Sequence, residues 1–580
     1  MAEAAEWTDK NFTKIIIIGA GIGGISAADA LTKNGITDFK ILEAGSKIGG
    51  RIEAIEAGKL KLEMGANYIH GILGNPMYEL ALSHGLIDIT HSPKPHNVVA
   101  AMEDGSQVPF SILQEIYEAY ICFLKRCEEY FTSDFLPPDG ITSVGDHIKL
   151  EAELYLDKMT NSNEKHLKQL IFDCLLKRET CITGCDDMGD VDLLELGSYT
   201  ELQGGNILVS GGYSSILNAV AQDIPPENIV LNHVVSDVKW ASADSNGDYF
   251  YGSGYDSGID LLANSDVNND SDSDKTVTGG TPTPRRRSST SNRCSVERII
   301  NEDDKLETFN KSVSEKLCDI TEEKESSLCE VVCENGAKFF AHHVICTIPL
   351  GVLKEKATTL FSPKLPQDKL DSINKLSFGT VDKIYLEYPR PFLHGNVSEV
   401  MLLWEAEPED TPLESSWFKK IYAFSKVTET LILGWISGKE ARYMETLPEQ
   451  VVGEKCTQIL RKFLNDPYIP LPKSCLSSKW YSRQHFKGSY TSIAVGASQM
   501  DVRRVAQPLC AHSQQKKPVL LFAGEHTHSS FYSTVHGAYL SGKIAAHILL
   551  SGDELNEFKE EDEEEEDDDD EGDEVTDDEK

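Results

Sequence analysis

The sequence is poor in basic residues. Its 580 residues contain 55 Lys and Arg against 94 Asp and Glu, which gives a formal net charge of -39 at pH 7. Residues 553–580 hold 20 of these acids and two lysines, so the rest of the chain still carries -21. A negative field of this size repels the phosphates of nucleic acids and attracts cations. We therefore expect no nucleic-acid ligand and favour a small polycation or a basic protein segment.

Long hydrophobic runs are missing as well. No apolar stretch reaches the roughly 18 residues of a membrane span, so we expect no membrane segment. The start, MAEAAEWTDKNF, is acidic where a secretory signal is basic, and the final DDEK differs from a peroxisomal signal. These features predict a cytoplasmic protein, with the nucleus as the alternative.

Clustered metal ligands are also lacking. The chain has 13 cysteines, and its two closest pairs in sequence are Cys181/Cys185 and Cys329/Cys333. Neither pair has the neighbouring His or the second Cys pair that zinc requires. We expect reduced thiols and no metal site.

The chain does contain a nucleotide-binding pattern. The stretch KIIIIGAGIGGISAADALTKNG, from Lys14, predicts a strand, a glycine-rich turn and a helix, and the strand FKILEA then places Glu43 about 20 residues on. Gly19 permits the tight turn, Gly21 lets the main chain approach a pyrophosphate, and Gly24 allows close helix packing. The helix N-terminus supplies amide donors, and Glu43 would accept the ribose hydroxyls. The pattern predicts a dinucleotide-binding fold.

Three further motifs narrow the cofactor. AGSKIGGRI follows Glu43, LEMGANYIHG spans residues 62–71, and VLLFAGEHTHSSFYSTVHGAYLSGKIAAHIL spans residues 519–549. Together with the glycine pattern, this set resembles the flavin amine oxidases, in particular those of the polyamine and spermine oxidase type. The resemblance extends from Lys14 to about Ser551.

The resemblance implies non-covalently bound FAD. In that family the glycines of the turn meet the pyrophosphate, and Glu43 holds the adenosine ribose. Arg51 would contact the phosphates or the ribityl chain, Val238 would flank the adenine, and Glu525 would hold the ribityl hydroxyls. Four more positions would lie beside the flavin ring: Gly65, Ala66, Asn67 and Val535.

A lysine lies inside the strand predicted from KLSFGTVDKIYLEYPRPF, residues 375–392. From Val381 to Tyr388 the residues alternate as in a half-buried strand, and Lys383 shares a face with Val381 and Tyr385. Taken alone, this face could point to water. The resemblance instead places Lys383 beneath the flavin, where it orients water toward N5 and assists imine hydrolysis or the reaction with oxygen.

The same resemblance implies an aromatic tunnel for an aliphatic amine, because rings pack on methylene groups and attract ammonium groups. Tyr490 matches one aromatic wall. The opposite wall is Thr534, a departure shared with the spermine-oxidase type, which makes a small aromatic monoamine a poorer fit. His70 would meet a substrate nitrogen near the site of oxidation, or act as a structural hydrogen-bonding group. Glu201 is a candidate for a distal ammonium.

The implied reaction is FAD-dependent oxidation of spermine, spermidine or their N-acetyl forms. Hydride would pass from a carbon next to the secondary amine to flavin N5. Imine hydrolysis would give an aldehyde and a shorter amine, and reoxidation by O2 would release H2O2. Two alternatives stay open: an enzyme like the histone lysine demethylases, and a catalytically silent flavoprotein scaffold. Protein partners of the acidic tail are not identified.

A composition with 40% hydrophobic residues and this length suits two or three domains. The strand–turn–helix pattern and the resemblance imply an α/β fold, α+β overall. A Rossmann-like FAD-binding domain, discontinuous in sequence, takes residues 12–95, 205–242, 327–345 and 516–551. A substrate domain of mixed sheet plus helices takes residues 96–204 and 346–515.

The apolar spacing predicts helices over residues 111–176 and strands over residues 376–437. Residues 243–326 are rich in Ser, Asp, Gly and Asn and interrupt a predicted hairpin. We expect disorder in this insertion and in the acidic tail, residues 552–580.

Overall fold

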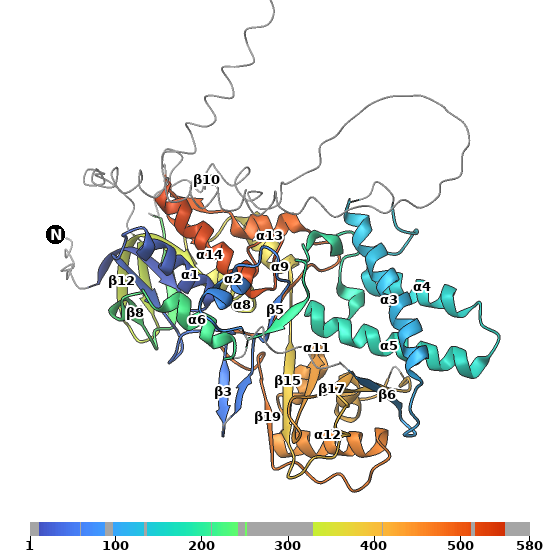
Figure 1. Ribbon diagram of the computed structural model, residues 1–580. Helices are drawn as coiled ribbons and strands as arrows, with labels where there is room; N and C mark the ends of the chain where they lie inside the picture. The colour runs from blue at the N-terminus through green and yellow to red at the C-terminus, as the bar shows by residue number, and fades with distance from the viewer. Residues whose placement is uncertain are drawn as a thin grey trace, which may run out of the picture.

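The computed structural model describes most of the chain (Figure 1). The described residues are 11–58, 60–87, 97–132, 136–209, 211–241, 250–251, 329–408, 410–511 and 517–551. The predicted disorder of residues 243–326 and 552–580 lies outside them, except for β10 (Phe250–Tyr251), a short strand where disorder was expected. Across the described ranges, no helix combines the length and the apolar character of a membrane span. The mixed α/β character is confirmed.

A ten-stranded sheet contains β1 at its centre. Its main path runs β10-β21-β22-β12-β1-β2-β8, and the strands from β22 to β8 are parallel. Ile16 and Ile18 pack into one hydrophobic core, whereas Ile15 and Ile17 pack into another on the opposite face. Burial on both faces explains the continuous isoleucine run. The bounds are β1 Phe12–Ile18, β2 Phe39–Leu42, β8 Ile229–Val230, β12 Lys338–Cys346, β21 Leu509–Cys510 and β22 Leu520–Phe522.

Two helices from opposite ends of the chain lie side by side on this sheet: α1 (Ile22–Lys33) and α14 (Val535–Leu550) (Figure 1). Small residues let them approach closely, since a Cβ at Gly542 would lie 2.0 Å from the carbonyl oxygen of Gly23. The Ser26 hydroxyl donates to the Tyr539 carbonyl across the contact, at 2.8 Å. Further helices cover the two faces: α2 Pro76–Ser83, α6 Tyr213–Ala221, α8 Leu350–Leu360, α9 Gln367–Lys375 and α13 Gln499–Ala506.

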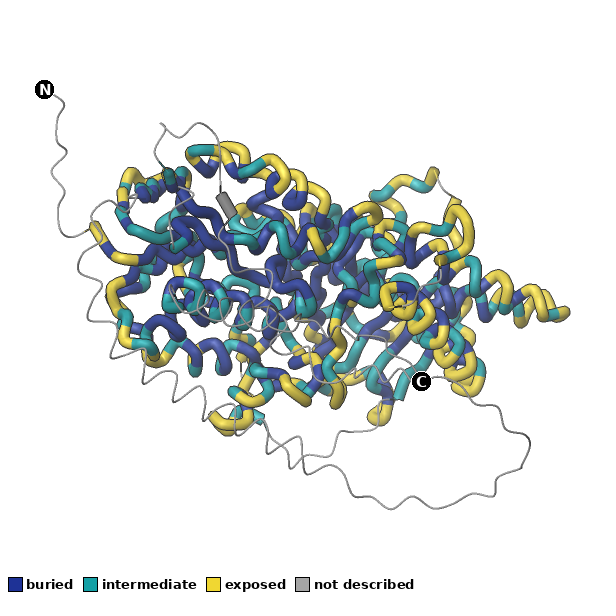
Figure 2. The backbone as a smooth tube through the Cα atoms, turned by 90° about the horizontal axis from the view of Figure 1, so that it is seen from above, coloured by how far each residue is buried: buried dark blue, intermediate teal, exposed yellow. Residues whose placement is uncertain are grey.

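A six-stranded sheet, ordered β19-β15-β18-β17-β16-β6, forms the second region. Its strands are β6 Val98–Met102, β15 Val381–Glu387, β16 Glu399–Leu403, β17 Ala423–Lys426, β18 Leu431–Ser437 and β19 Ser474–Ser477. Its helices are α3 Phe110–Thr132, α4 Val144–Leu156, α5 Ser162–Thr183, α11 Gly438–Met444 and α12 Glu449–Phe463. The helices expected over 111–176 and the strands expected over 376–437 are therefore confirmed. Figure 2 shows buried segments running through the interior of both regions.

The strand β15 corrects one expectation. All of its residues except Glu387 are buried, because β18 and β19 flank it and side chains pack on both faces. Lys383 is only 2% exposed, and Asp382 on the opposite face is also buried. The half-buried strand and the water-facing alternative for Lys383 are both wrong.

The expected domain boundaries run through one packed core. The strand before the insertion forms β8 and β9 (Val235–Lys239), and β9 pairs with β11 (Cys329–Cys333) as the expected hairpin. However, β13 (Phe361–Ser362) and β21 are strands of the ten-stranded sheet, although both lie between residues 346 and 515. Helices α8, α9 and α13 pack in the same core, so this region extends beyond the predicted first domain.

Three two-stranded sheets carry further segments of the candidate site. They are β3 (Ala54–Ala57) with β4 (Leu60–Glu63), β5 (Tyr68–His70) with β7 (Asn206–Leu208), and β14 (Ser377–Gly379) with β20 (Tyr490–Ser492).

Candidate active site

The turn between β1 and α1 has the geometry that the glycine pattern predicts. Gly19 has a φ of +103°, a conformation that favours glycine. A Cβ at Gly24 would lie 2.0 Å from the Gly19 carbonyl oxygen, so Gly24 is required for packing. A Cβ at Gly21 would meet no atom within 4 Å. The Gly21 side of the turn therefore leaves room for a ligand beside the start of α1.

Glu43 binds the main chain of this turn. One carboxylate oxygen accepts from the Ala20 amide and the other from the Gly45 amide, both at 2.7 Å. Two residues that sequence reasoning missed lie alongside, because the amides of Asn232 and His233 donate to the carbonyls of Gly45 and Glu43. Glu43 thus joins the turn to the loop before β9.

Val238 disagrees with its expected place beside an adenine. Its side chain is 0% exposed and packs in the core of the sheet. In the sheet, Val238 pairs with Val331 on β11 and with Phe361 on β13. Neither its side chain nor its main chain is free for a ligand. The loop at residues 232–233 is the part of this segment that reaches Glu43.

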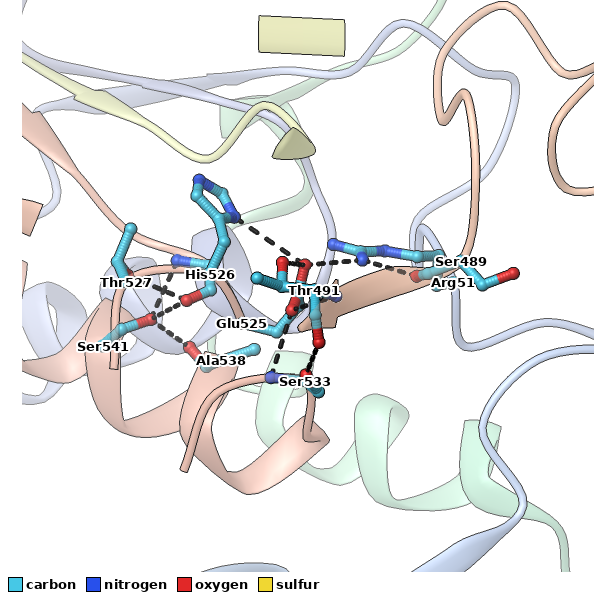
Figure 3. Close-up of polar contacts among 10 residues, drawn as sticks. Arg51, Ser489, Thr491, Glu525, His526, Thr527, Ser533, Ala538 and Ser541 are labelled. Carbon is cyan, nitrogen blue, oxygen red and sulfur yellow. Dashed lines mark hydrogen bonds and ion pairs between the residues drawn. The ribbon is translucent and has the colours of Figure 1, made fainter. Parts of the chain in front are cut away.

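Arg51 and Glu525 form a half-buried ion pair at 2.9 Å (Figure 3). Glu525 follows β22, and its carboxylate also accepts from the Thr491 hydroxyl at 3.1 Å and the Ser533 amide at 3.1 Å. The Arg51 guanidinium also donates to the Ser489 carbonyl at 2.7 Å. The structure therefore brings together three segments that are distant in sequence: Arg51, residues 489–491 and residues 525–533.

Thr534, just before α14, has a capping role that the sequence analysis did not predict. The Thr534 hydroxyl accepts from the Gly537 amide at 3.0 Å and donates to the Phe531 carbonyl at 2.6 Å, so it caps the helix. Its role as a wall of the substrate slot stays a prediction. Ser533, which sequence reasoning missed, has a φ of +69° beside Glu525. Val535 is the first residue of α14.

Lys383 lies against the segment LEMGAN. Its ammonium donates to the carbonyls of Glu63 and Gly65, at 2.7 Å each, and lies 5.0 Å from the centre of the Trp435 ring. Burial lowers the pKa of Lys383 to about 7, although the Glu63 carboxylate opposes this shift. An ammonium has three donors, so one N–H remains after these two bonds.

The segment that Lys383 contacts also packs on Arg51. A Cβ at Gly65 would lie 1.7 Å from the Arg51 carbonyl oxygen, so only glycine fits there. The Ala66 amide donates to the same carbonyl at 3.2 Å, and Asn67 follows half-buried. The Trp480 ring covers the other side of Gly65, with Cζ2 3.2 Å from that Cβ position. The predicted residues of this loop are therefore close to Lys383 and Arg51.

His70 ends β5, on the strand that pairs with β7. Its ring Nδ1 lies 3.1 Å from the amide oxygen of Asn206, and the side chain reaches solvent. Loss of hydration lowers the pKa of His70, while Asn206 and the nearby Glu201 carboxylate act in the opposite direction. The structure thus brings Glu201 near His70, and its role toward a distal ammonium stays a prediction.

Tyr490 begins β20, directly before Thr491 of the Glu525 cluster. Its ring packs on Gly184, where a Cβ would lie 2.4 Å from two ring atoms, and its hydroxyl donates to the Cys181 carbonyl. These contacts fix Tyr490 between the end of α5 and the Glu525 cluster.

Two acids that sequence reasoning missed are connected to Glu201 through their charges. Glu128 on α3 interacts with Glu201, and Glu179 on α5 interacts with Glu128. Burial raises the pKa of Glu179 to about 7, Arg178 opposes this shift, and Glu128 adds to it. Both acids lie on amphipathic helices, where their spacing gives no signal of a site.

The site fits a dinucleotide cofactor. The open Gly21 turn, the Glu43 carboxylate and the Arg51–Glu525 pair supply the donor and acceptor types that a pyrophosphate, a ribose and a ribityl chain require. His526 is fully buried 3.9 Å from Glu525, and its ring nitrogens form no hydrogen bond with any described residue. No group of metal-binding side chains occurs in the described part of the chain.

Comparison with known families identifies the chain. A model of the family "Flavin containing amine oxidoreductase" matches residues 22–258 and 305–550. The chain belongs to this family. The flavin amine oxidase resemblance seen in the motifs is thereby confirmed, and FAD is the implied cofactor of this oxidoreductase.

Relatives of this flavin amine oxidase carry specific names. The human "Peroxisomal N(1)-acetyl-spermine/spermidine oxidase" is 30% identical over 563 residues, which cover 93% of this chain and 95% of the human one. "Probable polyamine oxidase 5" of Arabidopsis thaliana is 25% identical over 94% of this chain and 99% of its own length. "Possible lysine-specific histone demethylase 1" of Drosophila melanogaster is 25% identical over 92% of this chain and 62% of its own length.

Proposed function

We propose that this flavin amine oxidase oxidises polyamines, with O2 as the final oxidant. One observation carries the proposal: the Glu201 carboxylate lies near His70, and Glu128 and then Glu179 continue a series of interacting acids from Glu201, in addition to the cofactor cluster. A polyamine offers a second ammonium for such carboxylates, whereas a monoamine does not. The names of the human and Arabidopsis relatives support the same substrate class.

A Rossmann-like domain would hold FAD in this proposal. The amides that begin α1, with Gly19, Gly21 and Gly24, would face the pyrophosphate. Glu43 would accept the ribose hydroxyls, and the loop at residues 232–233 would lie on the adenosine side because it contacts Glu43. Arg51 and Glu525 would hold the phosphate or ribityl portion, with Gly65, Ala66, Asn67 and Val535 beside the ring.

Bound FAD would supply the hydride acceptor for the carbon next to the amine nitrogen. Lys383 keeps one N–H free of the Glu63 and Gly65 carbonyls, and this N–H would orient a water molecule. Its pKa of about 7 lets it exchange a proton with that water at neutral pH. The carboxylates of Glu201, Glu128 and Glu179 would attract the distal ammonium, and His70 would accept a hydrogen bond from an amine.

Product identification tests the proposal. The flavin-loaded enzyme should release hydrogen peroxide, an aldehyde and a shorter amine from spermine or N1-acetylspermine. Benzylamine and methylated histone-tail peptide should have a kcat/KM at least about a hundredfold lower, which corresponds to roughly 2.7 kcal/mol. Peptide demethylation at an equal rate would select the demethylase alternative, and absence of turnover with bound FAD would select the scaffold.

We also propose a cytoplasmic location, which rests on the sequence alone. The human relative is named as peroxisomal, so the cytoplasm and the peroxisome are the two locations to distinguish. A fluorescent fusion to the N-terminus, imaged with a peroxisomal marker, should show diffuse signal. Punctate overlap with the marker would contradict this location.

A further inference from the structure

Two buried carboxyl groups face each other behind the Lys383 strand. Asp382 of β15 is fully buried, and Glu445, directly after α11, is almost as buried. Both carboxyl groups accept hydrogen bonds from residues 478–482, and Glu445 lies close enough to Asp382 to raise its pKa. Such a contact needs a proton between the two groups, because two adjacent carboxylates without a cation repel strongly in a buried place.

The surrounding donors identify which group carries this proton. Both oxygens of Glu445 accept main-chain amides, from Tyr481 at 2.7 Å and from Ser482 at 2.6 Å. One oxygen of Asp382 accepts from the Ser478 hydroxyl at 2.6 Å and from the Trp480 amide at 3.1 Å. The other oxygen, Oδ2, receives no donor from the described residues. A proton on Oδ2 satisfies this atom and bridges to Glu445.

These bonds fix residues 478–482, and this segment holds the flavin side of the site. Trp480 donates from Nε1 to the Met64 carbonyl at 3.3 Å and packs on Gly65. Lys383, next to Asp382 in the strand, donates to the carbonyls on either side of Met64. Asp382 thus lies between the two side chains that hold residues 63–65.

We propose that Asp382 and Glu445 share one proton, carried by Asp382, and that this pair positions Trp480 and Lys383 against residues 63–65. The pair acts through these side chains and touches no substrate. The proposal does not depend on which amine is oxidised. It requires only that residues 63–65 lie at the reactive part of the site.

Other titratable groups surround the pair. Lys383 lies on the same strand, and its ammonium is bound to main-chain carbonyls. Arg442 of α11 is paired with Asp186. The Cys181 thiol of α5 stays neutral, since burial raises its pKa to about 11, and β18 places Ile436 opposite Asp382. Burial, and then the charge of Glu445, hold the pKa of Asp382 well above its usual range.

Two amide substitutions distinguish a proton on Asp382 from a merely polar contact. In Asp382→Asn, the amide oxygen can accept the two existing bonds and the NH2 can donate to Glu445, as the protonated acid does. In Glu445→Gln, one of two amides at Tyr481 and Ser482 would face an NH2 group that cannot accept. Asp382→Asn should keep at least about half of the parent kcat, whereas Glu445→Gln should lose at least about tenfold, or 1.4 kcal/mol, with a smaller change in KM. Glu440→Gln, at an acid inside α11 five residues before Glu445, is the matched control.

The free energy of unfolding of the flavin-loaded protein gives a second readout. Folded Asp382 keeps a proton that the unfolded chain, with an ordinary pKa near about 3.9, has lost. Its raised pKa therefore makes the parent less stable as pH rises from about 4 toward that folded value. Asp382→Asn cannot titrate, so its stability relative to the parent should increase over this range, while Glu440→Gln should follow the parent.

Three outcomes would overturn the proposal. The first is an equal loss of kcat in Asp382→Asn and Glu445→Gln. The second is a stability difference between Asp382→Asn and the parent that does not change with pH. The third is failure of Asp382→Asn to fold.

Discussion

The cofactor side and the substrate side of this site are built in different ways. On the cofactor side, Gly19, Gly24 and Glu43 lie within one βαβ segment, and their contacts are mostly to nearby main chain. On the substrate side, Lys383 and His70 come from different sheets, and each has a hydrogen-bond partner more than a hundred residues away in sequence. The geometry of the glycine turn and Glu43 is therefore local, whereas the Arg51–Glu525 pair and the substrate side depend on how distant segments pack.

The largest effect should come from the substrate side. Lys383→Met should keep fold and FAD but lower kcat by about 10²- to 10⁴-fold, the usual loss for a positioned proton-transfer group. Lys354→Met is the control, because Lys354 also donates to two main-chain carbonyls, at 3.0 Å and 2.6 Å, but on α8. Stopped-flow flavin reduction and steady-state peroxide release measure both steps. A kcat within twofold of the parent would remove Lys383 from catalysis.

The pH profile sharpens the same test. Because burial lowers the pKa of Lys383 to about 7, the parent kcat should increase as pH rises through that value and Lys383 becomes neutral. Lys383→Met should lose this step, and Lys354→Met should retain it.

The second effect belongs to the cofactor side. Glu43→Gln removes a charge that binds the turn through two amides, so FAD binding should weaken by about 1.5–3 kcal/mol, roughly 10- to 100-fold in Kd. Titration of the apoprotein with FAD, followed by flavin fluorescence, measures this change. Glu56→Gln, on an exposed strand position, is the control. Equal affinity in Glu43→Gln and the parent would place the ribose elsewhere.

The contrast also explains what the sequence could predict. The strand, turn and helix of residues 14–35 follow from local patterns, and Gly24 has the packing role that its motif position implies. The adenine role of Val238 was carried over from the resemblance, which does not say that β11 and β13 flank this residue on both sides. The sequence likewise predicted one solvent-exposed face for β15. It could not show that Asp382 is buried, because this burial depends on Glu445 and residues 478–482, which are distant in sequence.

Ser533 and Glu179 had no signal that sequence reasoning could use. Ser533 is exceptional because of its φ of +69° beside Glu525. The identity of a serine does not predict a positive φ. Glu179 became a site candidate only when packing placed α5 near Glu128 and raised its pKa to about 7.

A third, smaller effect should separate Thr534 from the substrate slot. Thr534 caps α14, so Thr534→Ala should lower the free energy of unfolding by about 1 kcal/mol. Thr534→Ser keeps the capping oxygen and should restore the stability. Chemical denaturation measures both, and KM for spermine should change little. A large change in KM with unchanged stability in Thr534→Ala would instead support the predicted wall.

The smallest effect should come from a single acid at the substrate side. Glu201 is exposed, so Glu201→Gln should cost only about 0.2–1 kcal/mol, up to roughly fivefold in kcat/KM for spermine. Attraction between exposed charges is screened over about 8 Å at physiological salt, so the parent kcat/KM should fall as ionic strength rises and the variant should respond less.

Glu227→Gln, an acid in the turn before β8, is the control. Because the cofactor side does not meet the distal ammonium, FAD affinity should stay equal in all three proteins. An equal salt response in the parent and Glu201→Gln would mean that other acids, such as Glu128 and Glu179, attract the substrate.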